Sequence, residues 1–209
     1  MDVTTVSELE EIYGSVSAST GRKAPASSVR KEIDHLTAEY RAMVVASPFF
    51  ALATSGPDGL DCSPRGDAAG FVEVADERTL LLPDRRGNNR LDSLRNIVTD
   101  PRVALLFLIP GIGETLRVNG TARLVRDRDL AARFEVNGKV PLLMIVVSVD
   151  SVYFQCPKAL VRSDLWNPER FRDRSSVPTP GEILAGINDG FDAAAWDAAY
   201  PERLRTTLY

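Results

Sequence analysis

The sequence is poor in the residues on which metal and thiol chemistry depends. It contains one histidine, His35, and two cysteines, Cys62 and Cys156, among 209 residues. A single histidine excludes a multi-histidine metal site, and two widely separated cysteines support neither a disulfide framework nor a thiolate zinc site. His35 falls in the first turn of a predicted helix, where a positive imidazolium is disfavoured, so a surface or packing role is favoured over a catalytic one.

Long apolar runs and clusters of cations are also lacking. The longest apolar run, residues 140–147, is too short to span a bilayer, and the first residues show neither the cationic nor the apolar region of a signal peptide. We therefore expect a soluble, cytoplasmic protein. A formal net charge of −4 without a dense run of Lys and Arg argues against a nucleic-acid surface, because phosphate-backbone binding needs many clustered cations.

The composition, 44% hydrophobic and 26% charged, suits one globular domain with appended helices. We expect a helical appendage and linker over residues 1–30, a core domain over 31–166 and an extension over 167–209. The appendage starts with Ser7-Glu-Leu-Glu10, the pattern of a capping box, and leads into a short helix that Gly14 ends.

The next helix and a series of β-prone segments define the core domain. Asp34 is expected to cap that helix, which places Leu36, Tyr40, Met43 and Val44 on one side. Turn residues separate several of the β-prone segments, and few have a helix long enough for a crossover, which favours an antiparallel barrel. The segments are residues 49–54, 60–65, 71–74, 79–82, 102–109, 115–125 and 142–154. Peripheral helices are predicted at residues 89–98, 128–134, from about 157, 182–187 and 192–199.

Residues 79–97 run from an apolar strand through a cationic turn into a helix. The helix is expected to begin with Asn88 or Asn89 as N-cap. A helix start carries unpaired N–H groups and the positive end of the dipole, which favour a phosphate. Arg85, Arg86 and Arg90 could add charge-assisted hydrogen bonds to it. Arginines in a turn are also commonly just solvated, so the local pattern leaves both interpretations open.

The order of several motifs is more specific than any one of them. The motifs are Phe49-Phe-Ala-Leu-Ala-Thr54, Ser63-Pro-Arg-Gly-Asp67, Leu81-Leu-Pro-Asp-Arg-Arg-Gly-Asn-Asn-Arg90, Arg102-Val-Ala-Leu-Leu-Phe107 and Glu114-Thr-Leu-Arg-Val-Asn-Gly120, with Cys156-Pro-Lys-Ala-Leu-Val-Arg-Ser163 before Trp166. Over roughly Pro48 to Trp166 the chain resembles the FMN-binding split-barrel proteins related to pyridoxamine 5′-phosphate oxidase. The resemblance implies a mainly β fold with peripheral helices, namely a six-stranded antiparallel Greek-key split β-barrel. It also implies a homodimer with FMN bound at the subunit interface, and the extension over 167–209 would pack on the barrel or on the dimer partner.

The resemblance also implies which residues would contact FMN. Phosphate contacts would come from Asn88, Asn89 and Arg90, while Ser63, Pro64, Arg65 and Gly66 would lie along the ring and ribityl chain, beside the strand end Leu82, Pro83 and Asp84. From the partner chain, Thr115 and Arg117 would face the pyrimidine end of the flavin, although both also suit ordinary outward-facing strand positions. Lys158 and Arg162, four residues apart, would face an anionic substrate or the flavin, or else form a solvated helix face. No catalytic side chain and no metal ligand are expected.

The sequence departs from pyridoxamine phosphate oxidases at one point. Those enzymes are expected to carry a C-terminal Arg-x-His substrate motif, whereas no histidine follows His35 here. Vitamin B6 oxidation is therefore not expected. The favoured function is an FMN-dependent oxidoreductase that moves a hydride or electrons between a small substrate or reduced nicotinamide and the flavin. The alternatives are a protein that binds or stores flavin, deazaflavin or haem without turnover, and a scaffold barrel without a cofactor.

Overall fold

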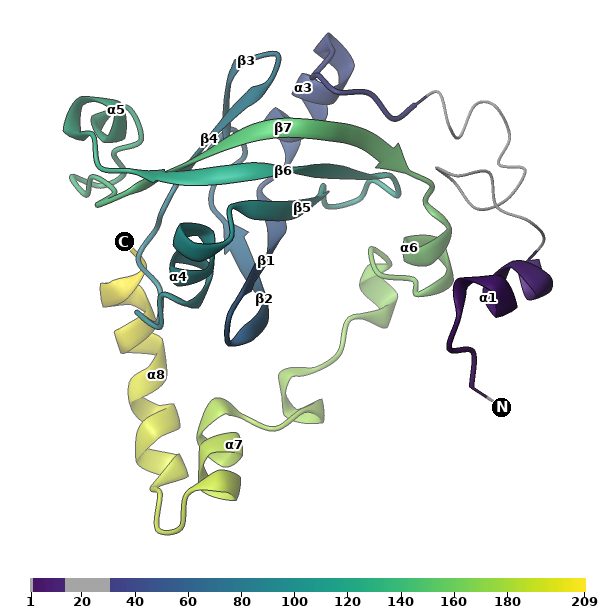
Figure 1. Cartoon of the computed structure of the whole chain (residues 1–209). Helices are drawn as coiled ribbons and strands as arrows, with labels where there is room; N and C mark the ends of the chain where they lie inside the picture. Colours follow the sequence, from purple (N-terminus) through teal and green to yellow (C-terminus); the bar gives the residue numbers. More distant parts are fainter. Residues whose placement is uncertain (1, 14–30) are drawn as a thin grey trace.

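The computed structural model describes residues 2–13 and 31–209 and is built on one antiparallel sheet of seven strands in the order β2-β1-β5-β6-β7-β4-β3 (Figure 1). The strands are β1 (Phe49–Gly56), β2 (Gly59–Gly66), β3 (Glu73–Asp76), β4 (Thr79–Pro83), β5 (Arg102–Leu108), β6 (Thr115–Val125) and β7 (Met144–Gln155). The prediction of a mainly β, antiparallel fold with peripheral helices is confirmed, and each predicted β-prone segment overlaps a strand, although residues 71–72 lie outside β3.

The six strands of the expected Greek-key split barrel are not confirmed, because the sheet has seven strands. The strand order of the sheet ends at β2 on one side and at β3 on the other. These two strands do not pair with each other, so the sheet of seven strands is open. β3 has four residues, pairs with β4 and carries a register shift between Val74 and Asp76. A strand this short and irregular ends a sheet because it offers few aligned groups for another strand to bond.

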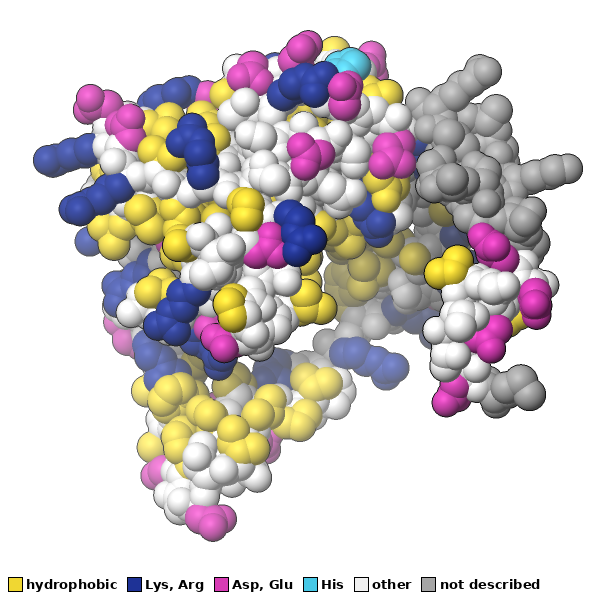
Figure 2. Space-filling view, in the orientation of Figure 1, with side chains coloured by type: hydrophobic (Ala, Val, Ile, Leu, Met, Phe, Trp, Pro, Cys, Tyr) yellow, Lys and Arg dark blue, Asp and Glu magenta, His cyan; other side chains and the backbone are white. Residues whose placement is uncertain are grey.

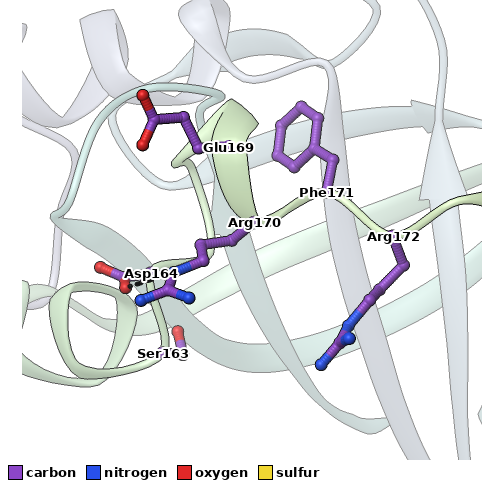
Figure 3. A pocket seen from close by; sticks show the side chains of 6 residues that line it. All are labelled: Ser163, Asp164, Glu169, Arg170, Phe171 and Arg172. Carbon is purple, nitrogen blue, oxygen red and sulfur yellow. Dashed lines mark ion pairs between the residues drawn. The ribbon is translucent and has the colours of Figure 1, made fainter.

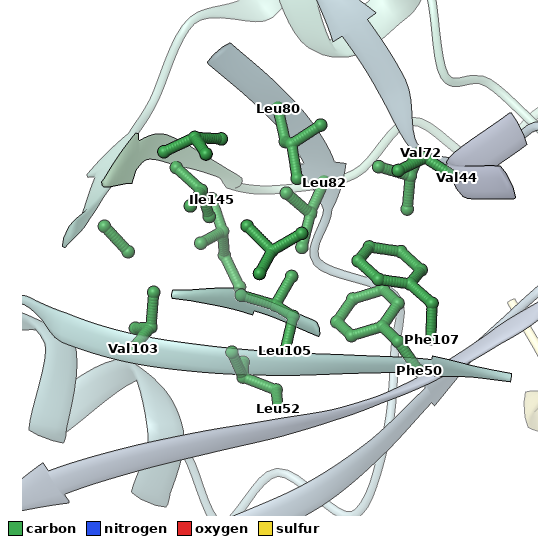
Figure 4. Close-up of a cluster of buried hydrophobic side chains, with 14 of the residues drawn as sticks. Val44, Phe50, Leu52, Val72, Leu80, Leu82, Val103, Leu105, Phe107 and Ile145 are labelled. Atoms are coloured by element: carbon green, nitrogen blue, oxygen red, sulfur yellow. The ribbon is translucent and has the colours of Figure 1, made fainter. Parts of the chain in front are cut away.

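The main core lies on one face of the sheet, where buried side chains alternate along strands such as β1 and β5, and a smaller buried cluster that includes Leu81 and Val146 lies on the other face. Phe50 and Leu52 of β1 and Leu105 and Phe107 of β5 are 1% exposed or less, and the ring centroids of Phe50 and Phe107 lie 5.0 Å apart (Figure 4). Each such side chain contributes roughly 1.5–3 kcal/mol by leaving water. This alternation fixes which side chains of the strands face away from the core.

Helices α1 (Val6–Tyr13) and α3 (Ala38–Ala46) precede the sheet. The predicted cap of α3 is wrong, because Thr37 accepts the first-turn N–H of Tyr40 while the carboxylate of Asp34 binds His35 and Arg78. The predicted buried side is confirmed for Leu36, Tyr40 and Val44. Gly14, the predicted end of the first helix, lies outside the described residues.

Helix α4 (Asp92–Thr99) begins later than predicted. Leu91 is its N-cap in a left-handed conformation, with φ of 64°, and makes no side-chain capping bond. Asn88 does not cap the helix, because its Oδ1 accepts the N–H of Arg90 and closes a turn. Asn89 adopts φ of 61°, a backbone region in which asparagine is tolerated. Leu94 and Ile97 bury this helix against the core, and Asn96 Nδ2 donates to Thr54 Oγ1 of β1 at 3.1 Å.

The remaining helices are α5 (Arg128–Ala132), α6 (Lys158–Arg162), α7 (Pro180–Ile187) and α8 (Ala193–Thr207), with 3₁₀ turns at Pro168–Arg170 and Arg174–Ser176. α7 and α8 form a hairpin in which Asp197 of α8 accepts the N–H of Gly181 at 2.9 Å and the hydroxyl of Thr179. α8 extends past the predicted residue 199 and continues through Pro201. The hairpin projects from the sheet, and the end of α8 returns toward the end of β4 (Figure 1). The domain division predicted at residues 30 and 166 stays a prediction.

Two features are absent from residues 2–13 and 31–209. Among them, no helix combines the length and apolar character that a bilayer crossing requires. Nor do these residues bring together three or more His, Cys, Asp or Glu side chains that could hold a metal ion.

Candidate functional site

Strand β2 presents its predicted ligand residues on two faces. Ser63 and Arg65 pair with Leu52 and Phe50 of β1 and so share the core-facing side. Pro64 pairs with Ala51 and faces the opposite side. A single β2 strand therefore cannot direct the whole Ser63–Gly66 stretch at one ligand through its side chains.

A chain of hydroxyl groups fastens α4 to β2. Ser93 Oγ donates to Asp61 Oδ2 at 2.6 Å, and Ser63 Oγ lies 2.9 Å from Ser93 Oγ. Because Ser93 has one hydroxyl proton and uses it on the carboxylate, Ser63 must be the donor in the second bond. Ser63 is thus left with lone pairs for any further partner. Sequence reasoning missed Asp61 and Ser93, and the available signal was the i, i+2 spacing of Asp61 and Ser63 on one strand face.

Arg65 and Asp84 join β2 to the residue that follows β4. Arg65 Nη1 lies 2.8 Å from Asp84 Oδ1, and each side chain is 20% exposed. Arg65 Nε is buried without a hydrogen-bond partner. Leu82 and Pro83 are buried at the end of β4. The structure therefore brings the predicted β2 and β4 groups together, and the Arg65 guanidinium keeps unused donor capacity.

Arg85, one of the predicted phosphate cations, is instead committed to the fold. Its Nε lies 2.7 Å from Asp67 Oδ2, and its Nη1 donates to Phe134 O at 2.7 Å. The Asp67 side chain is only 4% exposed and also accepts from Tyr209 Oη and the N–H of Ala68, each at 2.7 Å. Burial acts to raise the pKa of Asp67, but hydrogen bonds from Tyr209, Ala68 and Arg85 outweigh it and lower the pKa.

The loop before α4 carries the remaining predicted phosphate residues. Asn88, Asn89 and Arg90 are exposed, and Arg90 Nε lies 2.7 Å from Asp92 Oδ2. The hydrogen bond with Asp92 raises the pKa of Arg90 above its ordinary value. Arg86 is exposed and has no ion-pair or side-chain hydrogen-bond partner within residues 2–13 and 31–209. Arg86 is thus the uncommitted cation of this loop, whereas Arg90 must leave Asp92 to serve an anion.

Thr115 and Arg117 of β6 lie apart from these groups. Arg117 pairs in register with Leu106, which pairs with Ala51, which pairs with Pro64. Three strand spacings make this row about 14 Å long. Arg117 Nη1 donates to Tyr153 Oη at 2.9 Å on the face away from the core. Thr115 is 6% exposed.

Lys158 and Arg162 lie on α6, which follows the end of β7 where Gln155 pairs with Thr115, and both are exposed. One copy of the chain therefore holds the β2, β4 and α4 residues in one group and the β6 and α6 residues in another. The two groups differ in sheet face and in position along the sheet.

A separate cavity of about 460 Å³ lies in the segment after α6 (Figure 3). It is lined by Ser163, Asp164, Glu169, Arg170, Phe171 and Arg172, and Arg170 Nε lies 3.5 Å from Asp164 Oδ2. None of the predicted ligand residues lines this cavity. All of its walls come from one short exposed stretch of chain, so it is distinct from the β2–β4 group.

These observations define a class of protein: an open antiparallel β-sheet with peripheral helices, which gathers arginines, acids and hydroxyl groups where β2, β4 and α4 meet. The chain belongs to the pyridoxamine 5′-phosphate oxidase family, whose model matches residues 36–156, more than half of its length. The match contains β1 to β7 and the whole β2, β4 and α4 group. It ends before α6 and the α7–α8 hairpin.

Comparison with solved structures returns distant similarities, and no curated protein matches the chain. HupZ from Group A Streptococcus is 15% identical, with a TM-score of 0.46, over 57% of this chain and 94% of its own. General Stress Protein 26 from Bacillus anthracis is 17% identical, with a TM-score of 0.42, over 56% and 91%. An FMN-binding protein from Syntrophomonas wolfei is 13% identical, with a TM-score of 0.43, over 55% and 82%. Similarities this distant say nothing about ligand or activity.

Proposed function

We propose that the protein binds FMN where β2, β4 and the start of α4 meet, and that it is an FMN-dependent oxidoreductase acting on a small substrate. The observation that carries this proposal is the ion pair between Arg65 of β2 and Asp84 after β4, called the β2–β4 joint below. The guanidinium of Arg65 has an unpartnered Nε, and Arg65 lies on the strand that also holds Ser63. Membership of the family supports it. When bound, FMN supplies hydride or single-electron transfer, while the chain supplies binding and orientation.

The residues at this joint suit the chemistry of the cofactor. A phosphate needs cationic donors. Arg86 could bind it directly because no acid within the described residues pairs with Arg86, whereas Arg90 would first have to leave its partner Asp92. A flavin ring needs an apolar wall; Leu82 and Pro83 directly precede Asp84, the partner of Arg65, and because both are buried this strand end would face the ring through its backbone. Ser63, whose proton is directed to Ser93, would accept a hydrogen bond from a ring N–H rather than donate one.

A homodimer completes this proposal. Beyond the core, β1 and β5 present a half-buried or exposed apolar row on the outer sheet face, comprising Phe49, Ala51, Ala53, Ala104, Leu106 and Leu108. An uncovered apolar face of this kind is buried when a second copy packs on it. The β6 and α6 residues of one copy would then reach the β2–β4 group of the other, which a single copy does not achieve.

A second candidate function is flavin binding without turnover. The ionisable side chains of the joint bind one another in the pairs Arg65–Asp84, Arg85–Asp67 and Arg90–Asp92, which favours holding a ligand over moving a proton. Electron donors distinguish the two functions. Bleaching of bound flavin by a reduced nicotinamide, followed by reoxidation with an acceptor, supports the enzyme, and a flavin that no donor reduces supports storage.

The binding site is tested by titrating FMN and riboflavin into the flavin-free protein. We expect Arg86→Ala and Arg90→Ala each to lower FMN affinity roughly ten- to a hundredfold, the effect of one charge-assisted hydrogen bond, and to leave the weaker riboflavin binding unchanged. Arg95→Ala is the matched control because Arg95 is exposed on α4, the helix that follows this loop, and forms no side-chain bond within the described residues. Equal losses for both flavins, or none, would show that this loop does not hold the phosphate.

A further inference from the structure

A hydrogen bond from Tyr209 ties the α7–α8 hairpin to the sheet. Within the described residues, the one hydrogen bond between residues 168–209 and the sheet domain is donated by Tyr209 Oη to Asp67 Oδ1 at 2.7 Å. The guanidinium of Arg85 lies 5.7 Å from the centre of the Tyr209 ring. The hairpin carries exposed apolar side chains, including Ile183 and Leu204. Figure 2 shows hydrophobic side chains gathered on the lower lobe, where the hairpin lies. Its position therefore depends on the contacts of Tyr209.

Tyr209 is attached beside the proposed flavin site. Asp67 directly follows Gly66 at the end of β2, and Arg85 directly follows Asp84. The pairs Arg65–Asp84 and Asp67–Arg85 thus join the same two chain segments twice. Any shift of Asp67 or Arg85 would move its neighbour in the proposed ligand group.

The Tyr209 hydroxyl supplies one of three donors to a buried carboxylate. Asp67 is 4% exposed and accepts from Arg85, from the N–H of Ala68 and from Tyr209. A buried carboxylate that loses a donor must find water or a new position. Removal of the Tyr209 hydroxyl therefore takes one of the three donors that hold Asp67 in place between β2 and the end of β4.

We propose that Tyr209 is a positioning residue for the flavin site, so that docking of the α7–α8 hairpin and flavin binding stabilise each other. This inference rests on the proposed FMN binding at the β2–β4 joint. Such coupling is reciprocal: if the docked hairpin favours FMN, bound FMN favours the docked hairpin by the same factor. Tyr209 touches Asp67 and Arg85, and its effect on the ligand is transmitted through them.

The test compares Tyr209→Phe with Tyr200→Phe. Tyr200 lies on α8, which ends at Thr207 shortly before Tyr209; Tyr200 is 38% exposed and has no hydrogen bond from its hydroxyl within the described part of the chain. Two quantities are measured: the dissociation constant of FMN, and the rate at which trypsin cleaves the exposed segment at Arg170, Arg172 and Arg174, with and without FMN. In the wild type we expect FMN to slow this cleavage.

We expect Tyr209→Phe to raise the dissociation constant of FMN and the cleavage rate each about tenfold, the effect of one hydrogen bond to a charged group, and to lose most of the protection by FMN. Tyr200→Phe should match the wild type. The inference is overturned if Tyr209→Phe binds FMN with wild-type affinity, or if FMN protects it as well as the wild type. A wild-type protein that binds no FMN refutes the proposed function itself, and the inference with it.

Discussion

At the scale of single residues, the candidate site is defined by arginines that already have acidic partners. Arg65, Arg85 and Arg90 bind Asp84, Asp67 and Asp92, respectively. The first two pairs are largely buried, whereas Arg90 is 73% exposed and held by its neighbour two residues on. An exposed pair is screened by solvent and is easily exchanged. Affinity for an anion at this loop should therefore depend on the acid as much as on the arginine.

Replacing Asp92 by Asn tests this competition. The change frees Arg90 and removes a negative charge from the start of α4, so we expect FMN affinity to rise several-fold, with a larger gain at low salt. FMN titrations at two ionic strengths measure the effect. Asp129→Asn, in the first turn of α5, is the control for loss of a first-turn acid elsewhere. A lower FMN affinity in Asp92→Asn would mean that Asp92 helps to build the site.

The sequence predicts which arginines belong to the candidate site, but not which of them are free of an acidic partner and so able to bind an anion. Arg65, Arg85 and Arg90 stand out by type and by their position near strand ends. Their partners Asp67 and Asp84 come from another strand end in each case, so the pairing depends on how β2 and β4 meet. The predicted helix cap at Asn88 is wrong for a related reason. The side chain of Asn88 accepts the N–H of Arg90, which is as close in sequence as a capping partner would be.

At the scale of elements, β6 and β7 are the longest strands, and a register shift between Asn119 and Gly120 bends their pairing. A Cβ added to Gly120 would lie 2.0 Å from the carbonyl oxygen of Ser148. Only glycine allows this approach of the two backbones. The position thus fixes the curvature of the strands that carry Thr115, Arg117 and Tyr153.

Gly120→Ala should therefore lower the free energy of unfolding by about 1–3 kcal/mol, the usual cost of overpacking a buried site. Urea titration measures it. Gly87→Ala is the matched control, since no atom lies within 4 Å of a Cβ at that position, and it should stay within about 0.5 kcal/mol of the wild type. Equal stability of the two variants would contradict the close approach at Gly120.

The turn between α4 and β5 gives a prediction for acid conditions. The side chain of Arg102 and then its backbone N–H hold the pKa of Asp100 at about 2. In the unfolded chain the pKa is about 3.9. Because the folded value is the lower one, this contribution to stability is present above about pH 4 and is lost as the pH falls toward 2.

We expect the urea midpoint of the wild type to fall over that interval more steeply than that of Asp100→Asn. Asp58→Asn, in the exposed turn between β1 and β2, should behave like the wild type. Identical pH dependence in Asp100→Asn and the wild type would show that the pair with Arg102 does not persist in solution.

Element types were predictable because strands such as β1 are apolar and β-prone in sequence, whereas the alternation of buried and less buried residues along β1 appears only in the structure. Their boundaries shift by a few residues, and α8 runs well past the predicted end. Its continuation through Pro201 could not be read from local preference, because proline usually ends a helix.

At the scale of the whole molecule, the outer face of β1 and β5 predicts self-association. Leu106 lies in the middle of this apolar row and outside the core. We expect light scattering to show a dimer for the wild type and a monomer for Leu106→Glu, because a carboxylate cannot be buried there without a partner. Leu60→Glu, at a leucine that is 88% exposed near the start of β2, should remain dimeric.

FMN affinity provides the second measurement for this pair of variants. If the site is shared between copies, the Leu106→Glu monomer should bind FMN more weakly than the Leu60→Glu dimer. A monomeric wild type that binds FMN at full strength would refute the shared site and the assignments of Thr115, Arg117, Lys158 and Arg162.

The placement of the α7–α8 hairpin was beyond sequence reasoning. Its capping box at Thr179 and the cap at Asp192 are readable locally. The bond from Tyr209 to Asp67 joins residues 142 positions apart and depends on the whole path of the extension. Contacts this distant in sequence have no local signal.

An open sheet also exposes the outer edge of β2, a row of backbone groups on which strands of other molecules could grow into fibrils. Pro64 interrupts this row because it has no N–H to donate, and Asp61 and Arg65 place opposite charges on either side of it. The same short strand that lines the proposed ligand site therefore also keeps the protein from polymerising through its edge.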